Sequence, residues 1–131
     1  MANESGAGDI KSKPLGREML DIQDARFEDV AVPQWGQNGT APMVRIRTLT
    51  AEERDRYELD SYDAREKGSD VHLRARLLAL AIVDESGNRV FTDRDVPALA
   101  RKSAGAVEPI VKAIRRLNCL DVEQVEAAAK N

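Results

Sequence analysis

The stretch VPQWGQNGTAPMVRIRTLTAEERDRYE, residues 32–58, decides the predicted fold because it changes from an extended pattern to a helical one. Met43–Leu49 alternates apolar and polar side chains, which is typical of a strand whose buried face carries Val44 and Ile46 or their register neighbours. The Asn-Gly pair in the preceding loop predicts a turn, since glycine adopts positive φ without strain. We therefore predict an antiparallel β-hairpin over about residues 27–49.

The residues after the hairpin carry the signals of a helix start. Thr50 can accept a hydrogen bond from the amide of Glu53, and the Glu53 side chain can reach back to the Thr50 amide. Acidic side chains in this first turn complement the helix dipole. The predicted helix ends near Lys67, because Gly68 is a usual residue just past a helix C-terminus.

Four further helices are predicted downstream. The first of them is capped by Ser69 or Asp70 and continues to Val83. Its second half, LLALAIV, is apolar on all sides, so this helix is expected at the centre of the core. Apolar spacing and capping residues predict the other three helices over residues 92–100, 103–118 and 121–130.

These elements predict a mainly α (α+β) fold, with about five helices around a small core and an N-terminal antiparallel β-hairpin. Aromatic residues make up only 4% of the chain, so the core must be built from Leu, Val, Ile and Ala. Residues 15–131 are expected to form a single domain, with its helical part at about 50–130. Residues 1–14 are expected to be a disordered tail, and Leu15–Ile22 fits either one helical turn or a short strand.

Composition restricts the class of partner and the compartment. The formal net charge is −3, and an acidic balance argues against nucleic acid as the main partner. Cys119 is the single cysteine and forms no internal disulfide, which favours an intracellular location. The first residues lack a secretory pattern, and the longest apolar run, Leu77–Val83, is far shorter than the ~20 residues that span a bilayer.

No stretch of the chain predicts a catalytic, cofactor or metal site. His72 has no partner at ligand spacing and is expected at the surface or near a cap, and Cys119 is expected to be a small buried residue. Residues 84–95 fail as a calcium loop because Gly87 stands at the fourth position and not the sixth. The carboxylates of residues 52–60 are interleaved with arginines and predict a solvated helix face. The chain is therefore not predicted to be an enzyme.

Residues 95–117 provide an alternative function, because their helix, turn, helix spacing suits a small helix-turn-helix DNA-binding regulator. The basic residues of this region are Arg101, Lys102, Lys112, Arg115 and Arg116. Against this alternative, the second helix begins AVEPIVK, which has few side chains able to contact bases, and the whole chain is acidic.

The hairpin predicts a protein-binding surface. A lone hairpin is marginally stable in water, so it must lie on the helices or on another subunit. Trp35 beside Gly36 either closes the edge of the core or is exposed as an anchor for a partner, and both readings remain open. The predicted partner-binding residues are Trp35, Val44, Ile46, Leu49, Tyr57 and Tyr62.

Three motifs in order resemble the tail assembly chaperones of long-tailed, siphophage-type bacteriophages. V-P-x-W-G followed by V-R-I-R-x-L-T-A-E-E-R-D-R-Y-E, within residues 32–58, resembles the N-terminal signature of this family. RARLLALAIVDESGNRVFTDRDV, residues 74–96, resembles the second signature. Leu117-Asn118 followed by an Asp-capped segment at 121–130 is similar to the closing pattern, so the resemblance covers about residues 27–130.

This resemblance implies a non-enzymatic scaffold that binds the aggregation-prone tape measure protein while the tail tube polymerises around it. The expected partners are the tape measure protein, the tail tube protein and further copies of the chain, without nucleic acid or membrane. Family members often also exist as a longer frameshifted form, so this chain, which ends in AAAKN, would be the short form. The expected location is the host cytoplasm and not the mature virion.

Overall fold

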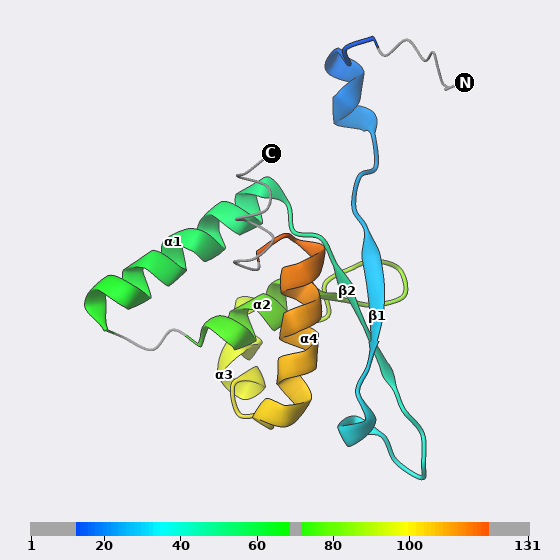
Figure 1. The fold of residues 1–131 in the computed structure, drawn as a ribbon, viewed down its shortest axis with the longest axis vertical. Coiled ribbons are helices and arrows are strands. Elements are labelled where there is room, and N and C mark those ends of the chain that lie inside the picture. The colour runs from blue at the N-terminus through cyan, green and yellow to red at the C-terminus, as the bar shows by residue number, and fades with distance from the viewer. Residues whose placement is uncertain (1–12, 69–71, 121–131) are drawn as a thin grey trace.

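The computed structural model describes residues 13–68 and 72–120 of the chain. Within them the fold is mixed α/β, with four α-helices and a three-stranded antiparallel sheet (Figure 1). Short 3-10 segments, labelled η, lie between these elements. In chain order the elements are η1 (Arg17–Asp21), β1 (Phe27–Ala31), η2 (Pro33–Trp35), β2 (Met43–Arg47), α1 (Ala51–Lys67), α2 (Leu73–Ala81), β3 (Ile82–Val83), η3 (Asp93–Asp95), α3 (Val96–Leu99) and α4 (Ala104–Leu117).

The predicted hairpin is present and lies on the helices. β1 and β2 pair antiparallel, with Glu28 opposite Ile46 and Val30 opposite Val44. Ile46 is fully buried, and both valines are half-buried against the core. α4 packs against both strands, and in Figure 1 it runs beside them. The alternating pattern of the second strand therefore predicted its buried face correctly.

The third strand corrects the predicted helix through Val83. α2 ends at Ala81, because Ile82 has extended backbone (φ −77°, ψ 127°) while its amide donates to the Leu78 carbonyl. Ile82 and Val83 then pair with β2, which gives the strand order β1-β2-β3. Both residues are β-branched and favour extended backbone, and the free edge of β2 offers them hydrogen-bond partners. Tertiary pairing thus ends the helix two residues earlier than its apolar pattern predicts.

The capping signals of α1 are confirmed. The Thr50 hydroxyl accepts from the Glu53 amide at 3.1 Å, and the Glu53 carboxylate accepts from the Thr50 amide at 2.9 Å. Gly68 ends the helix with left-handed backbone (φ 63°), and its amide donates to the Ala64 carbonyl. α1 projects from the rest of the fold (Figure 1), and Tyr57 is its one buried residue.

The core lies between α2 and α4 under the sheet. The second half of α2 is buried on several sides, as its all-apolar pattern predicts, and Leu77 and Leu78 are fully buried. Ile110 and Ile114 of α4 face them along one helical stripe. Ile46 of β2 completes this cluster, so the sheet and the two helices share one hydrophobic core.

Some predicted boundaries fall outside the described residues. These are most of the tail at residues 1–14, the Ser69 or Asp70 cap and the fifth helix at residues 121–130. α2 begins at Leu73 with His72 as its N-cap residue. For residues 15–22 the sequence predicts either one helical turn or a short strand, and the structure has the 3-10 segment η1 there.

The loop between β1 and β2 begins with η2 at the Trp-Gly pair and turns at Asn38 and Gly39, whose positive φ values (55° and 77°) confirm the turn predicted at the Asn-Gly pair. The amide of Trp35 donates to the Val32 carbonyl at 3.0 Å, which makes η2, and the Trp35 side chain is half-buried against the core. The chain then returns closely past Gly36. A β-carbon at Gly36 would overlap the carbonyl oxygen of Thr40 and lie 2.9 Å from Cδ of Pro42. Only glycine fits this position without a shift of the loop.

Gly36→Ala should lower the free energy of unfolding by about 2 kcal/mol, because the added methyl group meets backbone that cannot move away easily. Urea unfolding followed by fluorescence measures this, since Trp35 is the one tryptophan of the chain. Gly105→Ala is the matched control. A β-carbon there meets nothing closer than Ser103 Oγ at 3.9 Å, so this change should leave stability unchanged or raise it by up to ~1 kcal/mol. Equal stability of the two variants would contradict the steric explanation.

Candidate partner-binding surface

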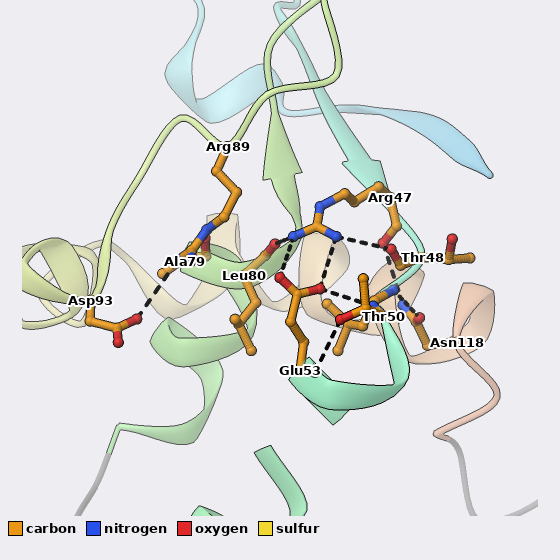
Figure 2. Close-up of polar contacts among 10 residues, drawn as sticks. Arg47, Thr48, Thr50, Glu53, Ala79, Leu80, Arg89, Asp93 and Asn118 are labelled. Atoms are coloured by element: carbon orange, nitrogen blue, oxygen red, sulfur yellow. Dashed lines mark hydrogen bonds and ion pairs between the residues drawn. The ribbon is translucent and has the colours of Figure 1, made fainter. Parts of the chain in front are cut away.

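Arg47 lies at the centre of the polar contacts between the sheet and the helices (Figure 2). Its guanidinium donates to both carboxylate oxygens of Glu53, at 2.9 and 2.8 Å, and to the Leu80 carbonyl at 2.7 Å. The side chains of Arg47 and Glu53 are only 12% and 21% exposed. One arginine therefore joins β2, the start of α1 and the end of α2, in the bidentate geometry that guanidinium and carboxylate favour.

The charge state of Glu53 follows from these contacts. Burial alone would raise the pKa of the Glu53 carboxyl, but the hydrogen bonds from Arg47 and Thr50 and the charge of Arg47 outweigh it. The net result is a pKa below the ordinary value, so Glu53 is held as a carboxylate. Its two oxygens are both occupied by donors of the protein, which leaves it unsuited to act as a general base.

We call the contacts of Arg47 with Glu53 and Leu80 the joint between β2, α1 and α2. Two further side chains, Arg89 and Asn118, extend it. Arg89 donates to the Ala79 carbonyl at 2.9 Å, so two arginines satisfy carbonyl groups that the end of α2 leaves open (Figure 2). Asn118, just past α4, accepts from the Leu49 amide at 2.7 Å and donates to the Ile114 carbonyl at 2.9 Å. The Asn118 bonds link the C-terminal end of α4 to the segment between β2 and α1, and the Arg89 bond links the end of α2 to the residues after β3.

A charged cleft of about 420 Å³ lies beside this joint. Its lining residues are Glu52, Glu53, Arg56, Tyr57, Asp60, Arg76, Leu80, Arg89 and Asp93. Most of the charged groups are in ion pairs, such as Arg76 with Asp60 at 3.7 Å and Arg89 with Asp93 at 3.7 Å. Within the described residues, no group of three His, Cys, Asp or Glu side chains could hold a metal ion. The charged groups of the cleft are therefore mostly bound to one another.

His72 and Cys119 do not share a site. His72 is exposed at the start of α2, as expected from its position near a cap. Cys119 is exposed beyond the end of α4, which corrects the expectation of a buried residue. Its backbone has φ 56°, so the chain turns there and carries the side chain outward. In the part of the chain that the structure describes, no helix is both long and apolar enough to cross a bilayer.

The six predicted partner-binding residues divide by burial. Ile46 is 0% and Tyr57 is 8% exposed, so both belong to the core of this chain. Trp35, Val44 and Leu49 are half-buried against the core. Tyr62, at 59% exposed, is on the surface of α1. α4 packs against both strands of the hairpin, so part of its apolar face is covered within the chain.

Residues 95–117 do not form the paired helices of a DNA-reading motif. α3 is a single turn of four residues, too short to lie across a DNA backbone beside a second helix. Two of the five basic side chains also have local partners: Arg116 pairs with Glu28 at 2.5 Å, and Lys102 lies 5.7 Å from the centre of the Trp35 ring. The geometry gives no support to the alternative of a DNA-binding regulator.

Exposed apolar side chains are gathered on two parts of the surface. The first is the N-terminal arm, defined as residues 13–26, which stands apart from the helices in Figure 1 and carries Leu15, Met19, Leu20 and Ile22, all at least half exposed. The second is a pair on α1, Leu59 and Tyr62, one helical turn apart. Exposed apolar groups gathered in this way are typical of protein-binding surfaces. Sequence reasoning missed the arm because its apolar residues follow no regular period.

A groove with basic walls lies between the helices on another part of the surface. Its volume is about 480 Å³, and α1, α2, α3 and α4 all contribute to it. Its lining residues are Ala64, His72, Leu73, Arg74, Ala75, Leu99, Ala100, Lys102, Ala104, Val107 and Arg115. Most of these residues are apolar, and the charged ones are Arg74, Lys102 and Arg115, with no carboxylate among them. The groove therefore combines an apolar lining with positive charge.

The fold has a counterpart among proteins of known structure. It is similar to the structure of the bacteriophage HK97 tail assembly chaperone, with a TM-score of 0.51 and 17% sequence identity. The similarity covers 74% of this chain and 88% of that chain. No protein-family model matches the sequence. No curated protein sequence matches it either. At this identity the likeness establishes a shared fold, and it is a fold of the family that the sequence motifs resemble.

Arg47→Met should lower the free energy of unfolding by roughly 3 kcal/mol, because it leaves the Glu53 carboxylate and the Leu80 carbonyl without their donor. Chemical denaturation followed by circular dichroism measures this. Arg45→Met, in the same strand, is the matched control: Arg45 pairs with Asp29 at 2.8 Å, but both side chains are well exposed to water. It should change stability little. Equal losses in both variants would contradict the role assigned to Arg47.

Stability should also fall in acid through Glu53. Because its pKa is lower in the folded chain than the ordinary value of 4.5, the carboxylate stabilises the fold above that pH. This contribution is lost as the pH falls through the lower folded pKa. Glu53→Gln should therefore be less stable at neutral pH and should lose less stability between neutral pH and about pH 3 than the unaltered chain.

Thermal unfolding at a series of pH values measures this difference. Glu52→Gln, on the same helical turn but exposed, is the control and should keep the full pH dependence. Asp29, whose pKa is lowered by its hydrogen bond from Arg45, accounts for part of the dependence that remains. An unchanged pH dependence in Glu53→Gln would show that this carboxylate is not linked to folding.

Proposed function

We propose that this chain is a non-enzymatic phage tail assembly chaperone. The observation that carries the proposal is the fold shared with the HK97 tail assembly chaperone over 74% of the chain. The sequence motifs that resemble the chaperone family lie within that fold, on the hairpin, α1, α2 and the turn after β3. Fold and motifs are separate observations, since one rests on backbone geometry and the other on residue order.

The proposed task is to bind the tape measure protein and keep it from aggregating while the tail tube assembles around it. A long, helical, aggregation-prone partner needs apolar contacts that are reversible and spread over a surface. The pair Leu59 and Tyr62 on α1 is suited to this, because charged residues surround it on the same helix. The charges keep the unbound surface in solution, and the apolar pair provides contact area.

The proposed contact surface thus differs from the hairpin surface that the sequence predicts. Of the six predicted residues, Tyr62 remains with its neighbour Leu59, while Trp35, Val44 and Leu49 contribute only through their exposed parts. α1 has the most surface available for such contacts, since sixteen of its seventeen residues are not buried in the core. A helix of this kind can lie against a helical partner along its length.

The remaining parts of the proposal follow from the same family likeness. The chain acts in the host cytoplasm and is absent from the mature virion. Its partners are the tape measure and tail tube proteins, and it self-associates during assembly. No cofactor is involved, because the task is binding without covalent chemistry.

Co-expression with the tape measure protein of the same phage tests the function. We expect the tape measure protein to become soluble and to co-purify with the chain, whereas it aggregates when expressed alone. Insolubility in both cases would count against the function. The double variant Leu59→Glu/Tyr62→Glu should reduce co-purification, while Val90→Glu, which alters an exposed apolar residue beyond β3, should not. Co-purification unaffected by the double variant would remove α1 from the contact surface.

A further inference from the structure

The N-terminal arm is fixed at its base and exposed along its length. The Arg26 amide donates to Thr48 Oγ1 at 3.0 Å, and the Arg26 carbonyl accepts from the Thr48 amide at 2.9 Å. The Arg26 guanidinium also donates to the Leu117 carbonyl at 3.2 Å. These bonds set the direction in which the arm leaves β1. Every residue from 13 to 26 is exposed, so within the described residues nothing covers the arm.

The part of the arm nearer its base combines apolar and acidic side chains. Residues 18–24, EMLDIQD, contain three carboxylates and no basic side chain. Between the carboxylates lie Met19, Leu20 and Ile22, and Leu20 is 72% exposed. Three large apolar side chains held in water within four residues are costly unless another surface covers them for part of the time.

The basic groove has the complementary character. Leu73, Leu99 and Val107 form apolar lining, while Arg74, Lys102 and Arg115 place positive charge around it. Arg74 is paired with Glu108 at 2.9 Å, whereas the contact of Lys102 with the Trp35 ring leaves its positive charge unneutralised. Lys102 and Arg115 are therefore the main source of attraction for an acidic segment. A groove of about 480 Å³ has room for a few side chains, within the ~300–1,000 Å³ typical of ligand pockets.

We propose that residues 18–24 of one copy of the chain bind in the basic groove of a second copy. Met19, Leu20 and Ile22 contact the apolar lining, and the carboxylates face Lys102 and Arg115. This is a heterologous contact, because the arm of one copy meets a different surface, the groove, on the next. The inference concerns self-association alone and stands whether or not the chain binds a tape measure protein.

A second copy is favoured over the groove of the same copy by the position of the arm. Arg26 is bonded at the C-terminal end of α4, close to Arg115, whereas the apolar lining of the groove at Val107 lies ten residues earlier, about 15 Å along the helix axis. From Arg26 the arm continues the line of β1 away from the helices (Figure 1). To reach the apolar lining of its own groove, the arm would have to reverse this direction between Arg26 and residues 18–24.

Sedimentation velocity at increasing protein concentration tests the association. The unaltered chain should show a sedimentation coefficient that rises with concentration and that falls when salt is added, because charge attraction contributes. Leu20→Glu/Ile22→Glu should weaken association by about tenfold or more per side chain. These residues are exposed, so the fold should be unaffected. Val90→Glu is the matched control and should associate like the unaltered chain.

The groove is tested by Lys102→Glu/Arg115→Glu and by Ala100→Trp, which fills the groove from an exposed position. Both groove variants should be monomeric with normal circular dichroism. Mixing a groove variant with the arm variant should restore association, since one partner keeps its arm and the other its groove. The proposal is overturned if the unaltered chain is monomeric throughout, if the groove variants associate normally, or if the mixture stays monomeric.

Discussion

The bidentate contact between Arg47 and Glu53 is the constraint on which the arrangement of the fold depends. A short hairpin and a weakly apolar helix would each be marginal alone. By binding Glu53 and the Leu80 carbonyl together, Arg47 fixes the start of α1 and the end of α2 relative to β2. The contact also combines two functions in Glu53, which caps α1 and balances the charge of a largely buried guanidinium. The hydrophobic core packs beneath the sheet that this contact holds against the helices.

This arrangement separates a rigid part of the molecule from its exposed surfaces. The apolar residues that fold the chain are concentrated in α2, α4 and β2, whereas α1 and the arm carry apolar residues that the fold leaves in water. The ion pairs and capping bonds are local and satisfied, so reactive groups with unused hydrogen-bonding capacity are not gathered in the charged cleft. Within the described residues, the apolar side chains left exposed on α1 and on the arm are therefore contact surfaces, which agrees with the proposed assembly role.

The extent to which the fold could be predicted follows the range of the interactions. Local signals were reliable: the Thr50 and Glu53 capping box, the Gly68 helix end and the alternation around Ile46 are all present. Signals that depend on distant partners were not. β3 forms because β2 offers it an edge, and the burial of Tyr57 depends on packing that the sparse apolar pattern of α1 does not reveal. The groove brings together four helices, so no single segment predicts it.

The attachment of α1 has a further consequence for motion. Tyr57, near its middle, is the one buried side chain of seventeen residues, and the joint with Arg47 holds only its first turn. The last two turns therefore rest mainly on their own backbone hydrogen bonds, and such segments open at a much lower free energy than the global unfolding of a domain. Their amides should exchange with deuterium well before those of α2 and α4. A helix that frays from one end in this way can adapt its length and direction to whatever lies against it, while the core stays closed.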